Sequence, residues 1–467
     1  MDYDIAVIGG GPGGYVAAIR AAQLGGRVLL IEKEKIGGAC LNRGCIPTKT
    51  LLKSAEKWED LKHCAEFGLR ADNIGFDFSV VTARKNKVVA GLRGGIEQLV
   101  KSNDITFVQG AAALTGPRHL EISTSRGQEN FEVNKIIIAT GSVPGSIPVP
   151  GHALPAVLTS DELLELTEVP KSLLVIGAGV VGMEFSAVMR AFGCEITVVE
   201  MLPNILPMVD SDIVKRLGLS LRKKGINILA SAQVTGIEEA AGGVVVKVDT
   251  GKDLREFAVE KVLVSAGRRP VTTGLGLETA GVEYDRTGIK VNEHLETTIP
   301  GIYAIGDVTG KSMLAHTAAA AGVVAAENAM GLHAVMDYRA IPACIFTTPE
   351  IAVVGLTEEE AKAQAIAIVS GKFNFAANGK AVTMGETDGL VKIIAEKDTR
   401  KIIGMHIMGP HASDLIMEGA LAIRNGLTAE AIAQTIHPHP TLSETVMESA
   451  HGILGDMIHQ IKMKSRK

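Results

Sequence analysis

Residues 5–14, IAVIGGGPGG, join a short apolar run to a glycine-rich turn near the start of the chain. The run has the length and composition of a buried strand. In the G-x-G-x-x-G pattern the first glycine permits a tight turn, the second lets the backbone approach a pyrophosphate, and the third lets the next helix pack on the strand. Gly9, Gly11 and Gly14 therefore predict a dinucleotide-binding unit with its anion at a helix N-terminus.

The same unit occurs again at residues 173–182, LLVIGAGVVG. Its three glycines are Gly177, Gly179 and Gly182. In both copies a helical pattern leads to a second apolar strand that ends at an acid, Glu32 or Glu200. The acid follows the first glycine by 23 positions each time, from 9 to 32 and from 177 to 200. One such motif is a weak signal, but two copies in one register predict two β-α-β units.

Both acids are placed to accept hydrogen bonds from a ribose diol. The alternative interpretation, a solvated strand end, does not explain why Glu32 and Glu200 recur at one offset. A carboxylate at Glu200 repels a 2′-phosphate, and residues 201–204, MLPN, offer no cation to bind one. The second unit is therefore predicted to bind NAD rather than NADP.

Two cysteines lie five residues apart in residues 37–49, GGACLNRGCIPTK. A loop that short restricts the unfolded chain less than a long one, so Cys40 and Cys45 are better suited to redox chemistry than to a structural disulfide. Lys49 follows Cys45 by four positions, and in a helix the two side chains would share a face. The ammonium would then lie near a thiolate. Taken alone, a lysine such as Lys49 is more often a surface residue.

Composition limits the function further. The 467 residues are enough for roughly three domains, and 46% hydrophobic residues with 52 glycines are typical of an α/β protein with many tight turns. The formal net charge of −5 argues against nucleic acid as a partner. The longest uncharged span, residues 312–326, is shorter than the ~18 residues that a membrane span needs. The acidic flank before residue 5 is unlike a secretory signal, so a cytoplasmic or organelle-matrix location is predicted.

Further strands are expected at residues 136–141, 262–267 and 302–307, each ending in turn glycines. Four prolines between 144 and 155 indicate a connector before the second unit. From residue 341 the pattern becomes β-rich, with a hairpin over 390–408 and helices from about 413. The three other cysteines are expected to be small buried hydrophobes, and no metal is indicated. These are Cys64, Cys194 and Cys344.

With these motifs, essentially the whole chain resembles the pyridine-nucleotide disulfide oxidoreductases. The resemblance implies an α/β fold with two Rossmann-like domains, which bind FAD and NAD, and an α+β C-terminal interface domain that forms a homodimer. The expected segments are an FAD-binding domain over 1–148, an NAD-binding domain over 149–266, a central segment over 267–338 that completes the FAD site, and a dimerisation domain over 339–467.

The resemblance also implies roles for individual residues. Cys40 matches the thiol that exchanges with the substrate, and Cys45 matches the thiol that lies against the flavin. Glu184 matches a residue near the nicotinamide that pairs with Lys49, although without the family it reads as a solvated helix residue. Further cofactor contacts are expected at the strand ends and at one helix start, where His316 fits core packing equally well. They are Thr140, Gly141, Gly267, Asp307, Ala315 and His316.

The last motif is residues 437–444, HPHPTLSE. Thiol chemistry near neutral pH needs a base, and histidine is the side chain that suits it. By resemblance His439 is that base and Glu444 its carboxylate partner. Thr441 and Glu444 also have capping-box spacing, which would explain Glu444 without catalysis. His437 reads as a structural residue, and Pro438 replaces the alanine commonly found between the two histidines.

Within this family the chain is most similar to members that oxidise dihydrolipoamide to lipoamide with NAD. The substrate would be free dihydrolipoamide or a lipoyl-carrying protein of a 2-oxoacid dehydrogenase or glycine cleavage complex, and His439 would serve the disulfide of the other subunit. The alternatives are NAD(P)H-dependent reduction of another disulfide, such as glutathione, trypanothione or coenzyme A disulfide, and mercuric reduction. A transhydrogenase and a non-catalytic scaffold subunit are further alternatives, which the two cysteines and His439 oppose.

Overall fold

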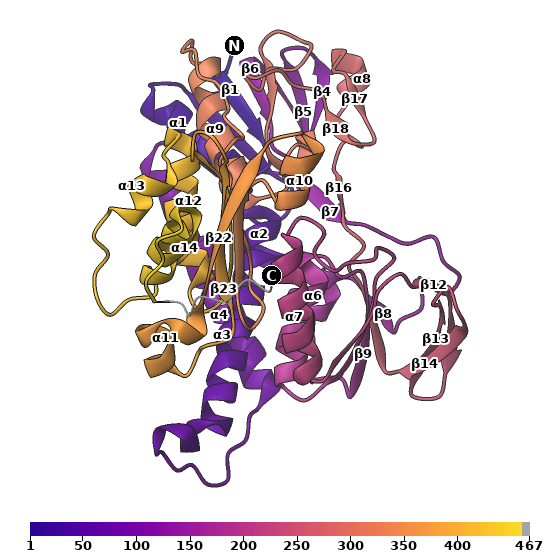
Figure 1. The fold of residues 1–467 in the computed structure, drawn as a ribbon. Coiled ribbons are helices and arrows are strands. Elements are labelled where there is room, and N and C mark those ends of the chain that lie inside the picture. The colour runs from indigo at the N-terminus through magenta and orange to yellow at the C-terminus, as the bar shows by residue number, and fades with distance from the viewer. Residues whose placement is uncertain (460–467) are drawn as a thin grey trace. The chain divides into compact units, whose positions relative to one another are not determined.

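The chain folds into two units, and the computed structural model describes residues 1–459 of it (Figure 1). The first unit holds residues 1–148, 157–169 and 263–336, and the second holds 149–156, 170–262 and the chain from 337 onward. The four segments expected from the sequence stay a prediction, because the two units do not separate them.

The first unit is built on a sheet with the strand order β3-β2-β1-β6-β5-β4, in which β19 also pairs with β6. Its strands are β1 (Tyr3–Ile8), β2 (Val28–Glu32), β3 (Thr106–Gln109), β4 (Ala111–Gly116), β5 (His119–Thr124), β6 (Gly127–Ile138) and β19 (Ile302–Ala304). β1 is parallel to β2 and β6, with Ala6 opposite Leu29 and Ile136. β5 pairs antiparallel with the first half of β6.

Both faces of the parallel strands are buried, as the near-continuous apolar runs require. Ile5 and Val7 pack on one face against α1 (Pro12–Gln23) and α9 (Ala315–Ala329), while Ala6 and Ile8 join the core on the other face. α1 and α9 lie side by side in Figure 1. Their backbones approach so closely that a Cβ added at Gly322 would lie 2.5 Å from the carbonyl oxygen of Gly13.

The remaining elements of the first unit surround this sheet. Its helices are α2 (Gly38–Arg43), α3 (Cys45–Lys62), α4 (Phe78–Ser102), α5 (Ser160–Leu163) and α8 (Leu277–Ala280), with 3-10 turns η1 (Cys64–Phe67) and η2 (Gly306–Thr309). The short strands are β7 (Ser142–Pro144), β8 (Val157–Leu158), β16 (Arg268–Pro270), β17 (Tyr284–Asp285) and β18 (Gly288–Ile289).

The second unit contains the second β-α-β motif. The order of its strands is β11-β10-β9-β15, with β9 and β11 both parallel to β10. The strands and helices are β9 (Ser172–Ile176), α6 (Val180–Ala191), β10 (Glu195–Val199), α7 (Ser211–Lys223), β11 (Ile226–Leu229) and β15 (Lys261–Val264). An antiparallel meander separates β11 from β15. It consists of β12 (Gln233–Ala240), β13 (Gly243–Asp249) and β14 (Leu254–Val259).

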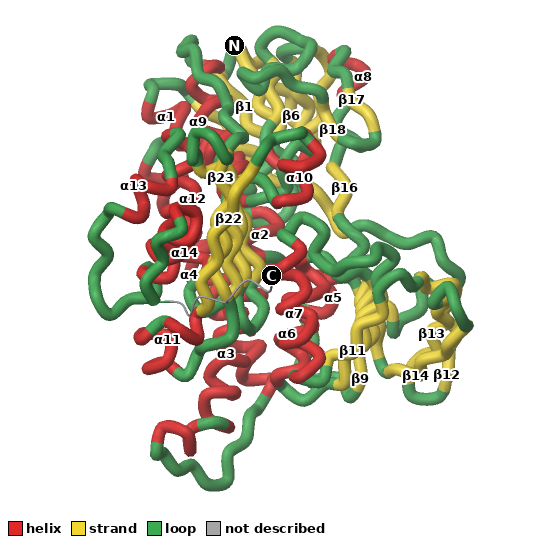
Figure 2. The backbone as a smooth tube through the Cα atoms, viewed as in Figure 1, coloured by secondary structure: helices red, strands yellow, loops and turns green. Residues whose placement is uncertain are grey.

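The C-terminal part of the second unit is an antiparallel sheet of order β20-β21-β24-β23-β22, drawn in yellow in Figure 2. Its strands are β20 (Ala343–Ile345), β21 (Ile351–Gly355), β22 (Ile368–Asn374), β23 (Leu390–Glu396) and β24 (Ile402–Met408). Its helices are α10 (Glu358–Ala363), α11 (Gly379–Met384), α12 (Ala412–Asn425), α13 (Ala429–Ala433) and α14 (Glu444–Leu454), with the 3-10 turn η3 (Phe375–Ala377). The predicted hairpin and the helices after it are confirmed.

Candidate active site

The two glycine-rich loops have the same backbone geometry. Gly9 has a φ of +108° and Gly177 a φ of +100°, a region that glycine adopts without steric cost. The N-cap of each following helix is extended, at φ −70° and ψ −176° for Gly11 and φ −76° and ψ −174° for Gly179. A glycine N-cap has no side chain to accept the first helical N–H groups, so in both loops these donors face the position of an anion.

Glu32 and Glu200 are held by equivalent pairs of backbone donors. Oε2 of Glu32 accepts from Gly10 N–H at 2.7 Å, and Oε2 of Glu200 accepts from Ala178 N–H at 2.7 Å. Each Oε1 accepts from the N–H two residues beyond its own, at 2.8 Å in both copies. Two donors fix each carboxylate and leave lone pairs for ribose hydroxyls. Because both glutamates are fixed to their loops, neither is merely a solvated strand end.

The cysteine segment packs directly on the first loop. Gly37 N–H donates to Gly10 O at 2.8 Å, and a Cβ added at Gly38 would lie 2.7 Å from the Cα of Gly11. Cys40 lies in α2 and Cys45 begins α3, so Cys45 and Lys49 lie on one helix, which is the condition under which their side chains share a face. The pair therefore lies beside the backbone that the first glycine motif presents to a dinucleotide.

The two thiols are in contact. The structure holds the pair in the dithiol form, with the side chains of Cys40 and Cys45 hydrogen-bonded. This hydrogen bond and burial raise the pKa of Cys40 above its ordinary value, while the positive charge of Lys49 acts in the opposite direction. A hydrogen-bonded pair of thiols can exchange between the dithiol and the disulfide form with a substrate.

The other predicted contacts of the first unit lie where strands end and α9 begins. Thr140 and Gly141 follow β6, Gly267 precedes β16, and Asp307 lies in η2. Ala315 and His316 are the first residues of α9, whose N-cap Leu314 carries no polar side chain, as expected for a helix that offers its N–H groups to a ligand.

A hydrogen-bonded chain that was not foreseen orients Asp307. Its Oδ2 accepts from the hydroxyl of Ser142 at 2.5 Å, and that hydroxyl accepts from Nε of Arg268 at 2.7 Å. Nothing in the residue type or spacing of Ser142 marks it in the sequence, because its partners are more than a hundred positions away.

In the second unit Glu184 lies in α6 and its side chain is buried, so the interpretation as a solvated helix residue is wrong. Its Oε1 accepts from the N–H of Phe346 at 2.9 Å. The pairing of Glu184 with Lys49 stays a prediction.

His439 and Glu444 form a dyad. Nδ1 of His439 lies 2.9 Å from Oε1 of Glu444, and Oε2 of Glu444 accepts from the N–H of Thr441 at 2.9 Å. Burial would raise the pKa of Glu444, but the hydrogen bonds from Thr441 and His439 bring it below its ordinary value. The carboxylate is thus ionised near neutral pH and holds the Nδ1 edge of the imidazole, which leaves Nε2 for proton transfer.

The expected capping box at Thr441 is wrong. α14 begins at Glu444 with Ser443 as its N-cap, so Thr441 lies outside the helix. Its hydroxyl donates to Pro438 O at 2.7 Å instead. Glu444 does accept from the Thr441 N–H, as a capping-box acid would, yet its second oxygen is committed to His439.

The side chain of His437 is 6% exposed and is held at both ring nitrogens. Its Nδ1 lies 2.8 Å from Thr435 O and its Nε2 lies 3.2 Å from Oε2 of Glu418. The hydrogen bond to Glu418 raises the pKa of His437. These contacts fit a structural or supporting role for His437, which stays a prediction, and Glu418 is a partner that sequence spacing did not indicate.

Among the other cysteines, Cys194 is buried, and burial raises its pKa to about 12. Cys64 and Cys344 are only partly buried, so the expectation of small buried hydrophobes is wrong for these two. Residues 1–459 contain no group of three or more His, Cys, Asp or Glu side chains that could hold a metal ion. No helix within the same residues is long and apolar enough to cross a membrane.

Comparison with known proteins supplies the family. The model described as pyridine nucleotide-disulphide oxidoreductase matches residues 3–322, and the model of that family's dimerisation domain matches residues 341–450. The chain is 45% identical over 454 residues to a dihydrolipoyl dehydrogenase of Chlamydia pneumoniae, with 96% of each chain covered. It is 42% identical over 463 residues to a dihydrolipoyl dehydrogenase of Geobacillus stearothermophilus, with 99% of this chain and 98% of that one covered.

A solved structure agrees with these matches. LpdA of Mycobacterium tuberculosis superposes with a TM-score of 0.89 at 29% identity, over 96% of this chain and 99% of that one. The fold class and the family predicted from the sequence are thereby confirmed. Two glycine loops of one geometry, a thiol pair against the first of them and a matching dimerisation domain place this chain in the pyridine nucleotide-disulphide oxidoreductase family.

Proposed function

We propose that this chain oxidises dihydrolipoamide to lipoamide and passes the electrons through FAD to NAD. The observation that carries the proposal is the contact between the Cys40 and Cys45 thiols on the first glycine loop. Relatives at 42–45% identity over nearly the full chain carry the name dihydrolipoyl dehydrogenase, which supports this substrate.

The first loop fits FAD and the second fits NAD. At Gly9 an added Cβ would lie 2.3 Å from Ala139 O, so this cradle admits only glycine and keeps the backbone open to a pyrophosphate. Glu32 would hold the FAD ribose and Glu200 the NAD ribose, through the lone pairs that their backbone donors leave. When bound, FAD would supply the two-electron chemistry that connects the Cys45 thiol to the nicotinamide.

The thiol steps involve this chain's own sulfur atoms. Starting from the Cys40–Cys45 disulfide, a substrate thiolate attacks Sγ of Cys40 and forms a mixed disulfide, and Cys45 leaves as a thiolate. The second substrate thiolate then attacks the substrate sulfur that is bonded to Sγ of Cys40, and Cys40 leaves as a thiolate. Lipoamide leaves with its ring disulfide closed, and the protein holds the dithiol pair, reduced by two electrons. Lys49, whose positive charge acts on Cys40, stabilises thiolate character in this pair.

His439 supplies the base for both substrate thiols. Its imidazole is 78% exposed, while Glu444 beside it is 21% exposed, so the ring is oriented from one side and accessible from the other. We propose that each His439 acts on the disulfide of the partner subunit in a homodimer. The match of residues 341–450 to a dimerisation domain supports this arrangement.

The remaining cofactor roles follow the first unit's geometry. Asp307, oriented by Ser142, would hold the flavin side chain, and the start of α9 at Ala315 and His316 would stabilise negative charge on a reduced flavin. In the cell the substrate would be a lipoyl group on a protein of a 2-oxoacid dehydrogenase or glycine cleavage complex.

Reduction of glutathione or coenzyme A disulfide with NADPH is not favoured. Residues 201–214 contain neither lysine nor arginine to bind a 2′-phosphate. Glu200 also places a carboxylate where such a phosphate would lie.

The proposal is tested by following NADH absorbance with dihydrolipoamide and NAD. Wild type is compared with Cys45→Ser and with Cys64→Ser, a control that changes a partly exposed cysteine outside the pair. We expect turnover in wild type and in the control, and loss of turnover in Cys45→Ser with FAD still bound. Turnover that persists in flavin-loaded Cys45→Ser contradicts the disulfide route, and flavin-loaded wild type without NADH formation contradicts the substrate.

A further inference from the structure

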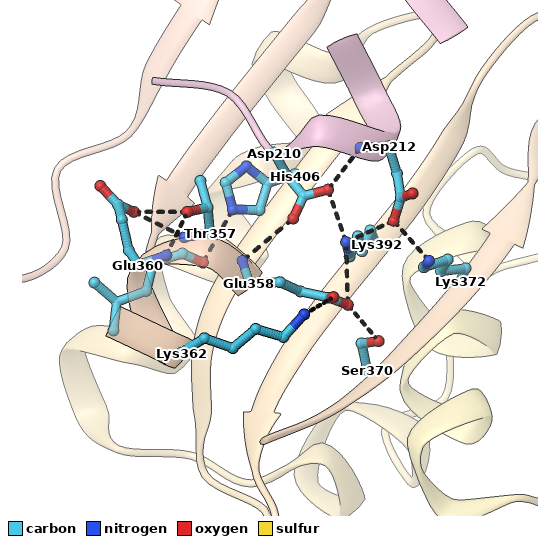
Figure 3. Close-up of polar contacts among 11 residues, drawn as sticks. Asp210, Asp212, Thr357, Glu358, Glu360, Lys362, Ser370, Lys372, Lys392 and His406 are labelled. Atoms are coloured by element: carbon cyan, nitrogen blue, oxygen red, sulfur yellow. Dashed lines mark hydrogen bonds and ion pairs between the residues drawn. The ribbon is translucent and has the colours of Figure 1, made fainter. Parts of the chain in front are cut away.

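A group of charged side chains is buried in the second unit, apart from the residues assigned above (Figure 3). At its centre Lys392 in β23 is 1% exposed. Its Nζ lies 2.7 Å from Oδ1 of Asp210, 2.7 Å from Oδ2 of Asp212 and 3.1 Å from Oε1 of Glu358. We call these four residues the Lys392 cluster. The ammonium has three N–H donors, and three carboxylates receive them.

Stability alone is a poor reason for such a cluster. Taking charges out of water is costly, and apolar residues of similar volume often replace a buried ion pair without loss. A better-attested role of a buried ion pair is to fix the arrangement of the elements that carry it. The Lys392 cluster joins β23 to the starts of α7 and α10.

Asp210 joins two helix starts to the C-terminal sheet. It is the N-cap of α7, and its Oδ1 accepts from the N–H of Asp212 at 3.0 Å. Its Oδ2 accepts from the N–H of Glu358, the first residue of α10, at 3.3 Å. Asp210 itself is 0% exposed. One carboxylate therefore fixes the start of α7, the helix after β10, against α10 and β23.

The start of α7 is linked to the ribose acid by a short, tightly held segment. Residues 200–210 run from Glu200 to Asp210, and within them Leu206 is 0% exposed with a φ of +47°. A leucine keeps a left-handed backbone only where its surroundings determine it. The N–H of Leu206 donates to Ala178 O at 3.0 Å, and the N–H of Ala178 donates to Glu200 at 2.7 Å.

We propose that the Lys392 cluster is a positioning device for the nicotinamide dinucleotide site. Lys392 fixes Asp210, Asp210 fixes the end of segment 200–210, and that segment holds Ala178 and Glu200 in the geometry that a ribose and a pyrophosphate require. Lys392 is a positioning residue, because it acts on the dinucleotide through Asp210. The inference rests on the proposed function, in which the second loop binds NAD.

Substitution of Lys392 has a matched control in Lys372. Both ammonium groups contact Oδ2 of Asp212, Lys392 at 2.7 Å and Lys372 at 2.6 Å, but the Lys372 side chain is 44% exposed. Lys372→Met removes a screened surface charge and leaves Lys392 on Asp210. Lys392→Met removes the only charge in Figure 3 that bridges all three acids.

The experiment measures NADH affinity by titration of the flavin-loaded enzyme, and separately the rate at which dihydrolipoamide reduces the flavin without NAD. For Lys392→Met we expect the Kd for NADH and the KM for NAD to rise roughly 3- to 30-fold, with unchanged flavin reduction. For Lys372→Met we expect the Kd for NADH and the KM for NAD to change by less than about 2-fold, because Lys372 forms an exposed ion pair. Asp210→Asn serves if Lys392→Met fails to fold, because the amide oxygen still accepts from the Asp212 N–H.

The inference is overturned if folded Lys392→Met or Asp210→Asn binds NADH like wild type, or if both half-reactions fall equally, as general destabilisation would cause. It is also overturned if wild type binds no NADH. Wild type that binds NADH but does not oxidise dihydrolipoamide contradicts the proposed substrate alone, since NADH affinity in the variants still decides the role of Lys392.

Discussion

Adding one methyl group at Gly14 is expected to abolish tight FAD binding. The new Cβ would lie 1.8 Å from the carbonyl oxygen of Gly9, well inside the 3.0 Å below which real Cβ contacts are essentially not found. Gly9 is itself held against β2, because its N–H donates to Ile31 O at 2.7 Å. α1 must therefore move off the loop. Overpacking of this kind costs about 1–3 kcal/mol, which corresponds to roughly 5- to 150-fold in the Kd for FAD where it falls on binding.

The assay is the FAD content of purified Gly14→Ala and its Kd for added FAD. The matched control is Gly91→Ala in α4, where an added Cβ would meet no heavy atom of the described chain within 4 Å. This control is expected to bind FAD normally and to gain about 0.5–1 kcal/mol of stability, because alanine replaces glycine in a helix. NADH binding to the second loop should persist in folded Gly14→Ala. Wild-type FAD affinity in Gly14→Ala would refute the reasoning.

Three further predictions concern the base, the ribose acid and acid stability. His439→Gln should lower kcat by about 100- to 10,000-fold and Glu444→Gln by about 10-fold, measured with dihydrolipoamide at saturating NAD; equal losses would show that orientation by Glu444 is not a separate effect. Glu200→Ala should raise the KM for NAD by about 10-fold and should lower the ratio of kcat/KM for NAD to kcat/KM for NADP. If that ratio is unchanged, the ribose role of Glu200 is contradicted. Burial would raise the pKa of Asp212, but hydrogen bonds and charge from its lysine partners lower it to about 2, so its stabilising contribution is present above about pH 4 and is lost as the pH falls toward 2. Asp212→Asn should therefore cost about 1–2 kcal/mol near neutral pH, after allowance for solvent screening, and the gap in melting temperature should close as the pH falls; a gap that does not depend on pH would contradict this.

Sequence pattern predicted the strands whose side chains form short, buried apolar runs. The strands before both glycine loops and those of the hairpin over 390–408 show such runs, and the structure contains them. The long strand β6 was anticipated only from residue 136. Its first half is polar and largely exposed because it belongs to an edge meander with β5, so no apolar run marks it.

The same limit applies to the site. Residues that a motif spaces by a few positions, such as Cys40 with Cys45 and His439 with Glu444, are in contact in the structure. The groups that orient them come from distant parts of the chain, as Ser142 does for Asp307. The capping-box error at Thr441 has a related cause, since spacing predicts which carboxylate reaches which N–H but not where the helix begins.

The two glycine loops differ in what packs on them and not in their own geometry. The cysteine segment packs on the first loop, and its Gly38 approaches Gly11 so closely that only glycine fits there. On the second loop its place is taken by segment 200–210, whose Leu206 N–H bonds Ala178 O. One β-α-β unit used twice thus presents two loops of the same geometry, and the segment that packs on each loop distinguishes them. Under the proposed function, the thiol pair would make the first loop a site of electron exchange. Segment 200–210, which carries no thiol and is held through Asp210 by Lys392, would leave the second loop to bind and release its dinucleotide.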